Sequence, residues 1–400
     1  MLAKPTVRSP SFQQLFDEGY EVEVRQQHLL VHAVPYVAAD RTVKRATLVC
    51  TFIESAGELL PPDNHQVWFT GEFPCLASGA QISQIVNENG RQEVFKDCWI
   101  NHRFSNKPDG VSGFTEHYSK MVHYVTLLSD QARVIDPSAD ARTGRVIESE
   151  EGQSVFKYPD TASARAEIVM VSARLGIPKV AIVGLGGTGS YVLDLVAKTP
   201  VGEIHLFDGD EFLQHNAFRA PGAATVTELK QRMPKTRYYQ QRYDPMRWGI
   251  ASHEYNLDQS NVGELAGFDF VFVCVDKGPA RAIICGYLQT QGIRFVDVGM
   301  SVEIVPESLK LVGTCRYTLS TPTQTEHIKT YVPMMEDSED ALYRKNIQVA
   351  DMNALNAVLA VMKWKQVYGF YQDDFQSHHG TFSVSAPSLT RDVMTGLVGA

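Results

Sequence analysis

Residues 179–220 read KVAIVGLGGTGSYVLDLVAKTPVGEIHLFDGDEFLQHNAFRA. The stretch opens with an apolar run over 180–183, whose composition is typical of a strand buried on both faces of a parallel sheet. A glycine-rich turn follows, and apolar residues then recur at helical spacing over 190–197. A second apolar run, 203–207, ends in Asp208. Strand, glycine turn, helix, strand and acid in this order are the fingerprint of a nucleotide-binding unit.

The turn contains Gly184, Gly186, Gly187 and Gly189. Glycines let the backbone approach a phosphate closely, and the start of a helix offers free N–H groups and a positive dipole end to an anion. Asp208 follows about twenty residues after the turn, where an acid can accept hydrogen bonds from a ribose. A dehydrogenase would show the same pattern, so the fingerprint alone does not select a chemistry.

Composition narrows the class of protein. The chain has 400 residues and a net charge of −9, which predicts two or three domains and argues against broad nucleic-acid binding. Its six cysteines include no C-x-x-C pair, so no structural zinc is expected. The N-terminus has no apolar signal-peptide core, and no later segment is typical of a membrane span. A reducing cytoplasm is therefore the expected location.

The chain divides into three predicted regions. Residues 1–135 are expected to form a smaller mixed α+β domain of unknown role, with helices near 12–16 and 114–128 and strands near 20–24, 28–34, 47–53 and 66–69. Residues 136–158 are polar and predict a linker. Residues 159–400 alternate strands with helices, which predicts an α/β fold: a Rossmann-like, largely parallel sheet with helices on both faces.

Further elements are expected in this last region. A helix is predicted over 160–175 with Asp160 or Thr161 as its N-cap, and another over 227–241 that is interrupted near Pro234. The remaining predictions are strands at 254–257, 268–276, 294–298 and 309–318, helices at 279–289 and 347–368, and a polar loop over 320–344.

Charged and polar residues follow the glycine turn in a recognisable order. They are Asp208 with Asp210, Asn216 with Arg219, Lys235 after a proline, and Asp276 at the end of an apolar strand with Arg281 close behind. Hydride transfer needs no such set. Adenylation does, because a carboxylate must attack the α-phosphorus against like-charge repulsion and pyrophosphate must leave as a polyanion.

With these residues in place, the sequence resembles the ThiF/MoeB adenylyltransferase superfamily, which includes the enzymes that activate ubiquitin and its relatives. The resemblance rests on GLGGTG, DGD, NAFR, MPK and CVD in family order, over about residues 160–370. It implies ATP and Mg²⁺, with Asp208 on the ribose, Asn216, Arg219 and Lys235 around the phosphates, and Asp276 on magnesium. An upstream arginine that reaches the ATP of a homodimer partner is also implied, and Arg165 is the candidate.

The resemblance further implies the substrate and partners. The expected activity is adenylation of the C-terminal tail of a ubiquitin-like protein for a conjugating-enzyme-like partner, in a bacterial conjugation pathway of antiviral defence. The N-terminal region resembles a domain often fused to such enzymes. Two alternatives stay open: adenylation of a small-molecule or RNA-borne carboxylate, and a nucleotide-binding pseudo-enzyme that scaffolds partners.

Four departures from the family pattern stand out. Ala220 replaces a glutamine after N-x-x-R, and Lys277 replaces an asparagine after the magnesium aspartate. Paired C-x-x-C zinc motifs are missing. The loop 320–344, where thioester-forming members carry a cysteine, has none. We therefore expect the acyl-adenylate to pass directly to a partner, without a cysteine thioester on this chain.

Overall fold

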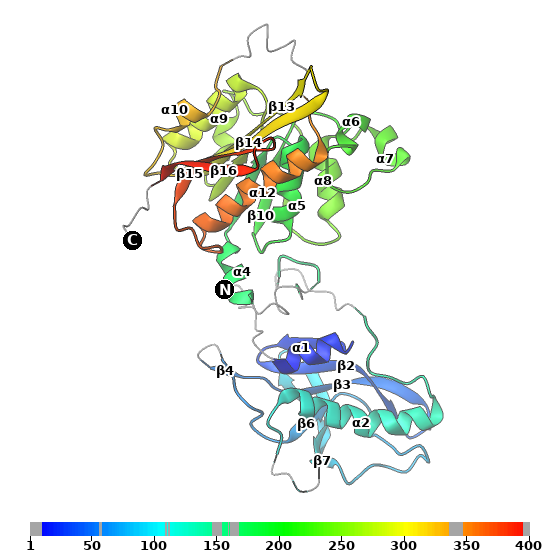
Figure 1. The fold of residues 1–400 in the computed structure, drawn as a ribbon. Helices are drawn as coiled ribbons and strands as arrows, with labels where there is room; N and C mark the ends of the chain where they lie inside the picture. The colour runs from blue at the N-terminus through cyan, green and yellow to red at the C-terminus, as the bar shows by residue number, and fades with distance from the viewer. Residues whose placement is uncertain are drawn as a thin grey trace. The chain divides into compact units, whose positions relative to one another are not determined.

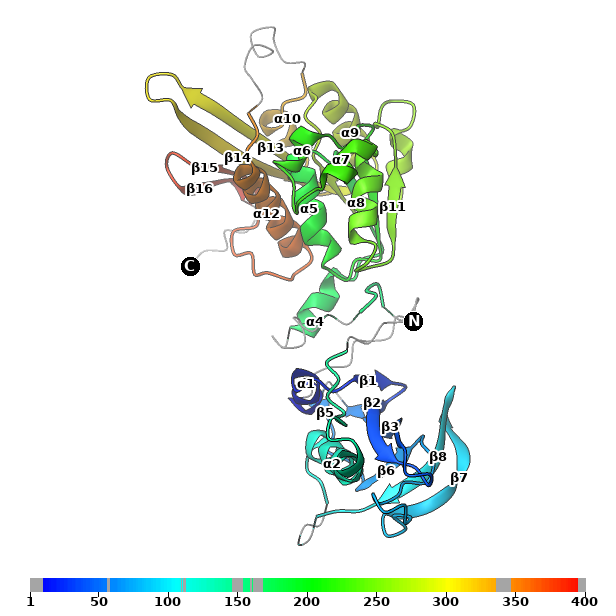
Figure 2. The same cartoon turned by 90° about the vertical axis from the view of Figure 1, so that its right-hand side faces the viewer.

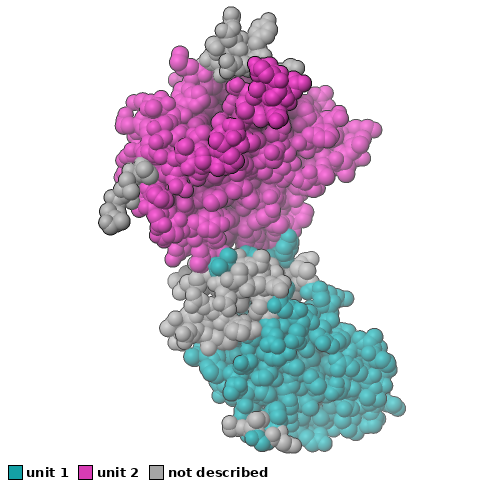
Figure 3. Space-filling model, in the orientation of Figure 1, with its two compact units in different colours: residues 1–149, 158–169 teal, residues 150–157, 170–400 magenta. Residues whose placement is uncertain are grey.

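The computed structural model describes residues 10–55, 58–108, 110, 113–145, 154–158, 160, 168–335 and 347–394. Two compact units make up the chain (Figure 3). The first comprises residues 1–149 and 158–169, and the second comprises residues 150–157 and 170–400. No helix in the described part of the chain is both long and apolar enough to cross a bilayer.

The first unit contains a six-stranded antiparallel sheet in the order β1-β2-β3-β6-β8-β7. Two helices lie over one face of the sheet (Figures 1 and 2), and their apolar sides share a core with it. The elements are α1 (Pro10–Asp17), β1 (Val22–Arg25), β2 (His28–Val37), β3 (Val43–Thr51), β4 (Glu54–Ser55), β5 (Glu58–Leu59), β6 (Gln66–Phe69), β7 (Val86–Phe95), β8 (Cys98–Ser105) and α2 (His117–Ile135).

Most elements predicted for this unit are confirmed. The helix expected near 114–128 begins at His117 and continues to Ile135, because Ser129 and Ala132 extend its buried side. Strands β7 and β8 were not predicted. The β7 sequence VNENGRQEVF is exposed along most of its length, so its side chains carry no apolar alternation that would identify a strand.

The second unit contains an eight-stranded sheet in the order β11-β10-β9-β12-β13-β14-β15-β16. The first five strands of this order run parallel, and the last three add antiparallel pairings. The strands are β9 (Lys179–Val183), β10 (Glu203–Phe207), β11 (Ile250–His253), β12 (Phe270–Val273), β13 (Arg294–Val305), β14 (Lys310–Ser320), β15 (Ser377–Ser383) and β16 (Ser388–Met394). The predicted α/β class with a largely parallel sheet is confirmed.

Helices cover both faces of this sheet. Val180 and Ile182 of β9 pack in one core with α5 and α12, whereas Ala181 and Val183 pack in a second core with α9. Strand β9 is therefore buried on both faces, as its apolar composition predicted. The helical elements are α4 (Val169–Ser172), η1 (Ala173–Leu175), α5 (Gly187–Ala197), α6 (Gln214–Ala217), α7 (Val226–Gln231), α8 (Lys235–Tyr243), η2 (Val262–Leu265), α9 (Gly278–Thr290), α10 (Ile328–Tyr331) and α12 (Ala350–Val367).

The position of β9 determines where a ligand can bind. Its neighbours in the sheet are β10 on one side and β12 on the other. The strands that follow β9 in the sequence are therefore added first on one side of it and then on the other, which makes β9 the switch point of the sheet. In open parallel sheets, ligands bind outside the carboxyl ends of the strands at such a switch point. The glycine turn, Asp208 and Asp276 all follow the carboxyl ends of these three strands.

Several local predictions need correction. The strand expected at 254–257 is wrong, because β11 ends at His253 and the next residues form a loop beside the glycine turn. The polar loop 320–344 contains the helix α10, and β15 and β16 were not predicted. The break near Pro234 is confirmed: α7 ends at a left-handed Arg232 (φ 47°), and Pro234 precedes α8.

The helix predicted over 160–175 is described only from α4 onward. Its second N-cap candidate, Thr161, and the candidate Arg165 lie outside the described residues. Part of the polar segment predicted as a linker packs on the second unit, where Phe156 pairs with Arg247 and the Lys157 N–H donates to the Met246 carbonyl at 2.9 Å.

Candidate functional site: a charged cleft at the glycine turn

The glycine turn is shaped by close contacts that exclude larger residues. Gly184 has φ +91°, and a Cβ there would lie 2.8 Å from the Cys274 carbonyl oxygen. A Cβ at Gly187 or Gly189 would collide with Asn353 or with the Gly184 carbonyl. Gly186, in contrast, has nothing within 4 Å of its Cβ position. It is also the N-cap of α5 and supplies no side-chain cap, so the first N–H groups of the helix have no side-chain partner at that position.

Asp208 is held firmly at the end of β10. It is 6% exposed, and its carboxylate accepts hydrogen bonds from the Leu185 N–H at 2.6 Å and the Asp210 N–H at 2.9 Å. These bonds tie the acid to both the glycine turn and the loop after β10. Lys235 Nζ also lies 3.3 Å and 3.4 Å from the two carboxylate oxygens, so donors already face the roughly four lone-pair sites of Asp208.

Lys235, the first residue of α8, lies against two carboxylates. Its Nζ is 3.3 Å from Asp208 Oδ1 and 2.7 Å from Asp210 Oδ2, and the side chain is almost fully buried. The hydrogen bond from Lys235 is the main reason that the pKa of Asp210 is lowered, and the positive charge of Lys277 acts in the same direction. The predicted acids and lysine are thus brought together from distant parts of the sequence.

Asn216 and Arg219 follow on the loop that carries α6. Asn216 is 3% exposed, and its Oδ1 accepts a hydrogen bond from the Leu213 N–H at 2.8 Å, which leaves the amide nitrogen as the available donor. Arg219 forms no ion pair or hydrogen bond through its guanidinium with any described residue, and its buried Nε has no partner. An arginine that lacks a protein carboxylate is suited to bind an external anion.

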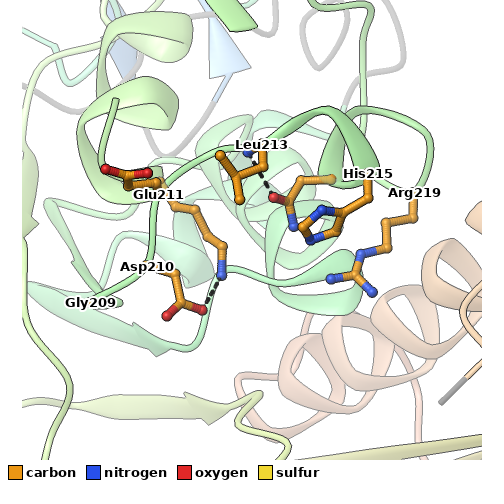
Figure 4. Close-up of a pocket in the computed structure, with 8 residues that line it drawn as sticks. Gly209, Asp210, Glu211, Leu213, His215 and Arg219 are labelled. Atoms are coloured by element: carbon orange, nitrogen blue, oxygen red, sulfur yellow. Dashed lines mark hydrogen bonds and ion pairs between the residues drawn. The ribbon is translucent and has the colours of Figure 1, made fainter. Parts of the chain in front are cut away.

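Two cavities adjoin these residues. The glycine-turn cavity, of about 220 Å³, lies at the carboxyl ends of β9, β10 and β12. The α6 cavity, of about 360 Å³, lies over the loop that follows Asp208. Figure 4 shows the α6 cavity, with Asp210 on one side and His215 and Arg219 on the other. Asp210, Arg219 and Lys235 line both cavities, so the same three charged side chains can contact a ligand in either one.

The two cavities differ in their other lining residues. The glycine-turn cavity has apolar walls and also contains Asp208, Asp276 and Lys277. The α6 cavity is mainly polar and contains Glu211, His215 and Asn216. An apolar wall suits a nucleoside, whereas the polar cavity suits a chain of phosphates.

Asp276 is exposed in the loop that leaves β12, and it lines the glycine-turn cavity. The described residues contain no group of three or more His, Cys, Asp or Glu side chains that could hold a metal ion. Mg²⁺ commonly binds through one or two carboxylates together with substrate phosphates and water, rather than in an all-protein cage. A single open carboxylate beside a phosphate-sized cavity therefore fits this ion.

Arg281, which the sequence placed near the charged set, serves a different purpose. Its Nε lies 2.9 Å from Oδ2 of the fully buried Asp297, whose other oxygen binds Arg316 at 2.6 Å. Its guanidinium also donates to the carbonyls of Pro333 and Val275. Arg281, noted in the sequence only as lying close behind Asp276, is thus held by an internal ion pair and by two backbone carbonyls.

The cysteines are poor nucleophiles in this structure. All six are free thiols, and burial raises the pKa of every one of them. The pKa reaches about 11 for Cys50 and about 12 for Cys315. Cys274 lines the glycine-turn cavity, but burial raises its pKa as well. At neutral pH these groups remain protonated thiols.

Sequence reasoning missed several lining residues. Asn256 accepts a hydrogen bond from the Gly209 N–H at 3.1 Å and so supports the loop after β10. His215 and Glu211 line the α6 cavity, and Lys277 was noted only as a departure from a pattern. Their shared signal is position: each follows the carboxyl end of a parallel strand, where ligands of open sheets bind.

The fold and the site together define an α/β protein with a charged cleft at the switch point of a largely parallel sheet. The chain belongs to the ThiF family, which matches residues 170–392, more than half of its length. The resemblance inferred from the sequence motifs is thereby confirmed. Residues 10–161 match a domain of unknown function, DUF6791.

Parts of the chain are similar to curated proteins and to solved structures. Ubiquitin-like modifier-activating enzyme 5 of Drosophila melanogaster is 23% identical over 201 residues, which cover 46% of this chain and 47% of that protein. The tRNA threonylcarbamoyladenosine dehydratase of Haemophilus influenzae is 26% identical over 134 residues, covering 32% and 49%. A structure of E. coli MccB with ATP has a TM-score of 0.46 at 18% identity and covers 58% of this chain and 68% of that one. The chain spans about half the length of the curated relatives it matches.

Proposed function

We propose that this chain is an ATP-dependent enzyme that adenylates the C-terminal carboxylate of a ubiquitin-like protein. The observation that carries the proposal is Arg219, a guanidinium that lines both cavities and has no ion pair or hydrogen bond within the described residues. ThiF-family membership supports an adenylyltransferase, and the similarity to ubiquitin-like modifier-activating enzyme 5 supports this class of substrate.

The proposed reaction exchanges one bond for another at the α-phosphorus. A carboxylate oxygen of the substrate attacks it, an acyl–phosphate bond forms, and the bond to the bridging oxygen breaks so that pyrophosphate leaves. Positioned cations and N–H donors lower this barrier by stabilising the developing negative charge. Mg²⁺ held by Asp276 and phosphate oxygens would supply further charge neutralisation.

Each charged residue has a distinct task in this proposal. Asp208 accepts hydrogen bonds from the ribose, and the N-terminus of α5 faces a phosphate. Lys235 lies against two carboxylates and lines both cavities, so its positive charge also acts on a phosphate bound there. Arg219 and the amide of Asn216 bind the phosphates from the α6 cavity.

The fate of the product is also part of the proposal. A conjugating-enzyme-like partner takes the acyl group directly from the adenylate, since all six thiols have raised pKa values. The active form is a homodimer in which Arg165 of each protomer reaches the ATP of its partner. The setting is a cytoplasmic conjugation pathway of antiviral defence.

One alternative has specific support. The similarity to tRNA threonylcarbamoyladenosine dehydratase favours an RNA-borne carboxylate as the substrate. The charged cleft would serve that substrate equally well, because the chemistry at the α-phosphorus is the same. A small-molecule carboxylate and a pseudo-enzyme that only binds nucleotide complete the set of alternatives.

ATP–pyrophosphate exchange separates these functions. Exchange that requires a ubiquitin-like protein with an intact C-terminal tail is the expected result, and a tail-truncated protein is the matched control. Exchange stimulated by tRNA instead would favour the RNA-borne carboxylate. ATP binding without exchange, in the presence of ubiquitin-like proteins and of tRNA, would favour the pseudo-enzyme and contradict the proposal.

A further inference from the structure

Lys277 occupies a position that the proposed reaction does not yet use. It follows Asp276 directly, is exposed, and lines the glycine-turn cavity without lining the α6 cavity. Its side chain has no ion pair or hydrogen bond with a described residue, although its charge acts on Asp210 across the cleft. An exposed ammonium group without an internal ion pair therefore lines the glycine-turn cavity.

The carboxylates of the cleft make an additional positive charge necessary in this cavity if a phosphate is to bind there. Asp208, Asp210 and Asp276 bring three carboxylates to the glycine-turn cavity, and Lys235 is already shared between the first two. Arg219 lines both cavities and can serve the phosphates in the larger one. A nucleotide whose α-phosphate lies near these carboxylates requires a further cation, because like charges at close range raise the free energy of binding.

We propose that Lys277 binds the α-phosphate of the nucleotide, while Arg219 binds the phosphates that leave as pyrophosphate. This inference rests on the proposed function and assigns a cation to each end of the triphosphate. The α-phosphate stays on the adenylate, so a cation there also reduces the repulsion that an incoming carboxylate meets. Lysine is suited to the task, since its ammonium is a compact point charge on a flexible stem.

The division between the two cavities supports the assignment. The nucleoside has an apolar wall only in the glycine-turn cavity, and the α-phosphate is the one attached to the nucleoside. Lys277 lines that cavity and does not line the polar α6 cavity, which contains Arg219, His215 and Asn216. Phosphates beyond the first therefore have room and donors in the α6 cavity.

Equilibrium binding of adenosine, AMP and ATP to the full chain tests the proposal without turnover. Lys277→Gln should weaken AMP and ATP by similar factors, about tenfold or more, because a hydrogen bond to a charged group is lost in both. Adenosine affinity should not change. Lys277→Arg should retain most of the affinity. Arg219→Ala should weaken ATP much more than AMP, and Lys230→Gln, a change on the exposed side of α7, is the control for lost surface charge.

The outcomes separate this inference from the proposed function. Wild-type protein that binds ATP, together with a Lys277→Gln variant that binds AMP as tightly as wild type, would overturn only the role of Lys277. An equal loss of adenosine and AMP would also overturn it, since that result indicates a distorted pocket. If the wild-type protein binds neither ATP nor AMP, the proposed function itself is contradicted. Binding with and without Mg²⁺ shows whether the lysine acts independently of the metal.

Discussion

Lys235 and Asp208 form an ion pair that is almost closed to solvent, with Nζ 3.3 Å from Oδ1 and each residue 6% exposed. The pair joins the start of α8 to the end of β10. Because Asp208 also accepts the Leu185 N–H, the same contact holds the glycine turn in place. Internal contacts thus fix the charged residues of the cleft, and charges held in place reduce the reorganisation that a reaction requires.

Lys235→Ala should reduce both stability and activity. Breaking a buried pair leaves Asp208 uncompensated, and we expect a loss of about 3 kcal/mol in the free energy of unfolding, because two backbone N–H groups still hold the acid. Urea denaturation measures this loss. The double variant Asp208→Asn with Lys235→Met should recover much of the stability and none of the exchange activity. Full stability in Lys235→Ala alone would contradict the structural role.

Arg219→Ala should reduce activity and leave stability almost unchanged. Its guanidinium has no ion pair or hydrogen bond to a described residue, so stability should change little, while the ATP–pyrophosphate exchange rate should fall by about 10²–10³, as on removal of a transition-state donor. Arg232→Ala is a matched control, since Arg232 binds Glu211 on the surface, 2.7 Å away. Equal rates for Arg219→Ala and wild type would mean that Arg219 is only a surface cation.

Asp276→Ala should abolish magnesium-dependent exchange and leave the fold intact. The side chain is exposed and lies outside the apolar core, so its removal leaves packing unchanged. Circular dichroism and thermal denaturation should match wild type, whereas exchange over a range of Mg²⁺ concentrations should be lost. Glu264→Ala, on the surface of the same unit, is the control. Near wild-type exchange in the Asp276 variant would rule out the metal role.

Arg165 is predicted to act across a homodimer. A mixture of Arg165→Ala and Asp276→Ala proteins should recover about a quarter of wild-type exchange, because half of the random dimers contain one complete site. Each variant alone should be inactive. Sedimentation velocity at the assay concentration provides the independent check. A monomeric active enzyme, or no recovery in a mixture shown to contain heterodimers, would exclude this arrangement.

The acyl group is predicted to leave without a thioester on this chain. Burial raises the pKa of Cys50 to about 11 and of Cys315 to about 12, so at pH 7–8 both stay protonated and react slowly. Non-reducing mass spectrometry after incubation with ATP and the substrate should find no covalent adduct. A DTT-sensitive adduct that disappears when a single cysteine is replaced by alanine would refute the prediction and identify the nucleophile.

Local sequence patterns predicted some elements of each unit and missed others. The apolar run 180–183 and the glycines identified β9 and α5, because burial on both faces and a tight turn restrict which residue types fit. The exposed strand β7 and the strands β15 and β16 gave no comparable signal. Their stability comes from pairing with neighbours that lie elsewhere in the sequence, so it does not appear as an apolar pattern.

The order of residue types along the chain alone determined the fold class and named the residues of the cleft: the glycine turn, Asp208, Asp210, Asn216, Arg219, Lys235 and Asp276. Only the tertiary structure decided which charges already have partners. Arg219 and Arg281 are both arginines of the same unit, yet the first lines the cleft without an ion pair to a described residue and the second binds the buried Asp297. An arginine that an internal carboxylate already neutralises is less available to a ligand, and that pairing depends on which distant strands and helices the fold brings within a few ångströms.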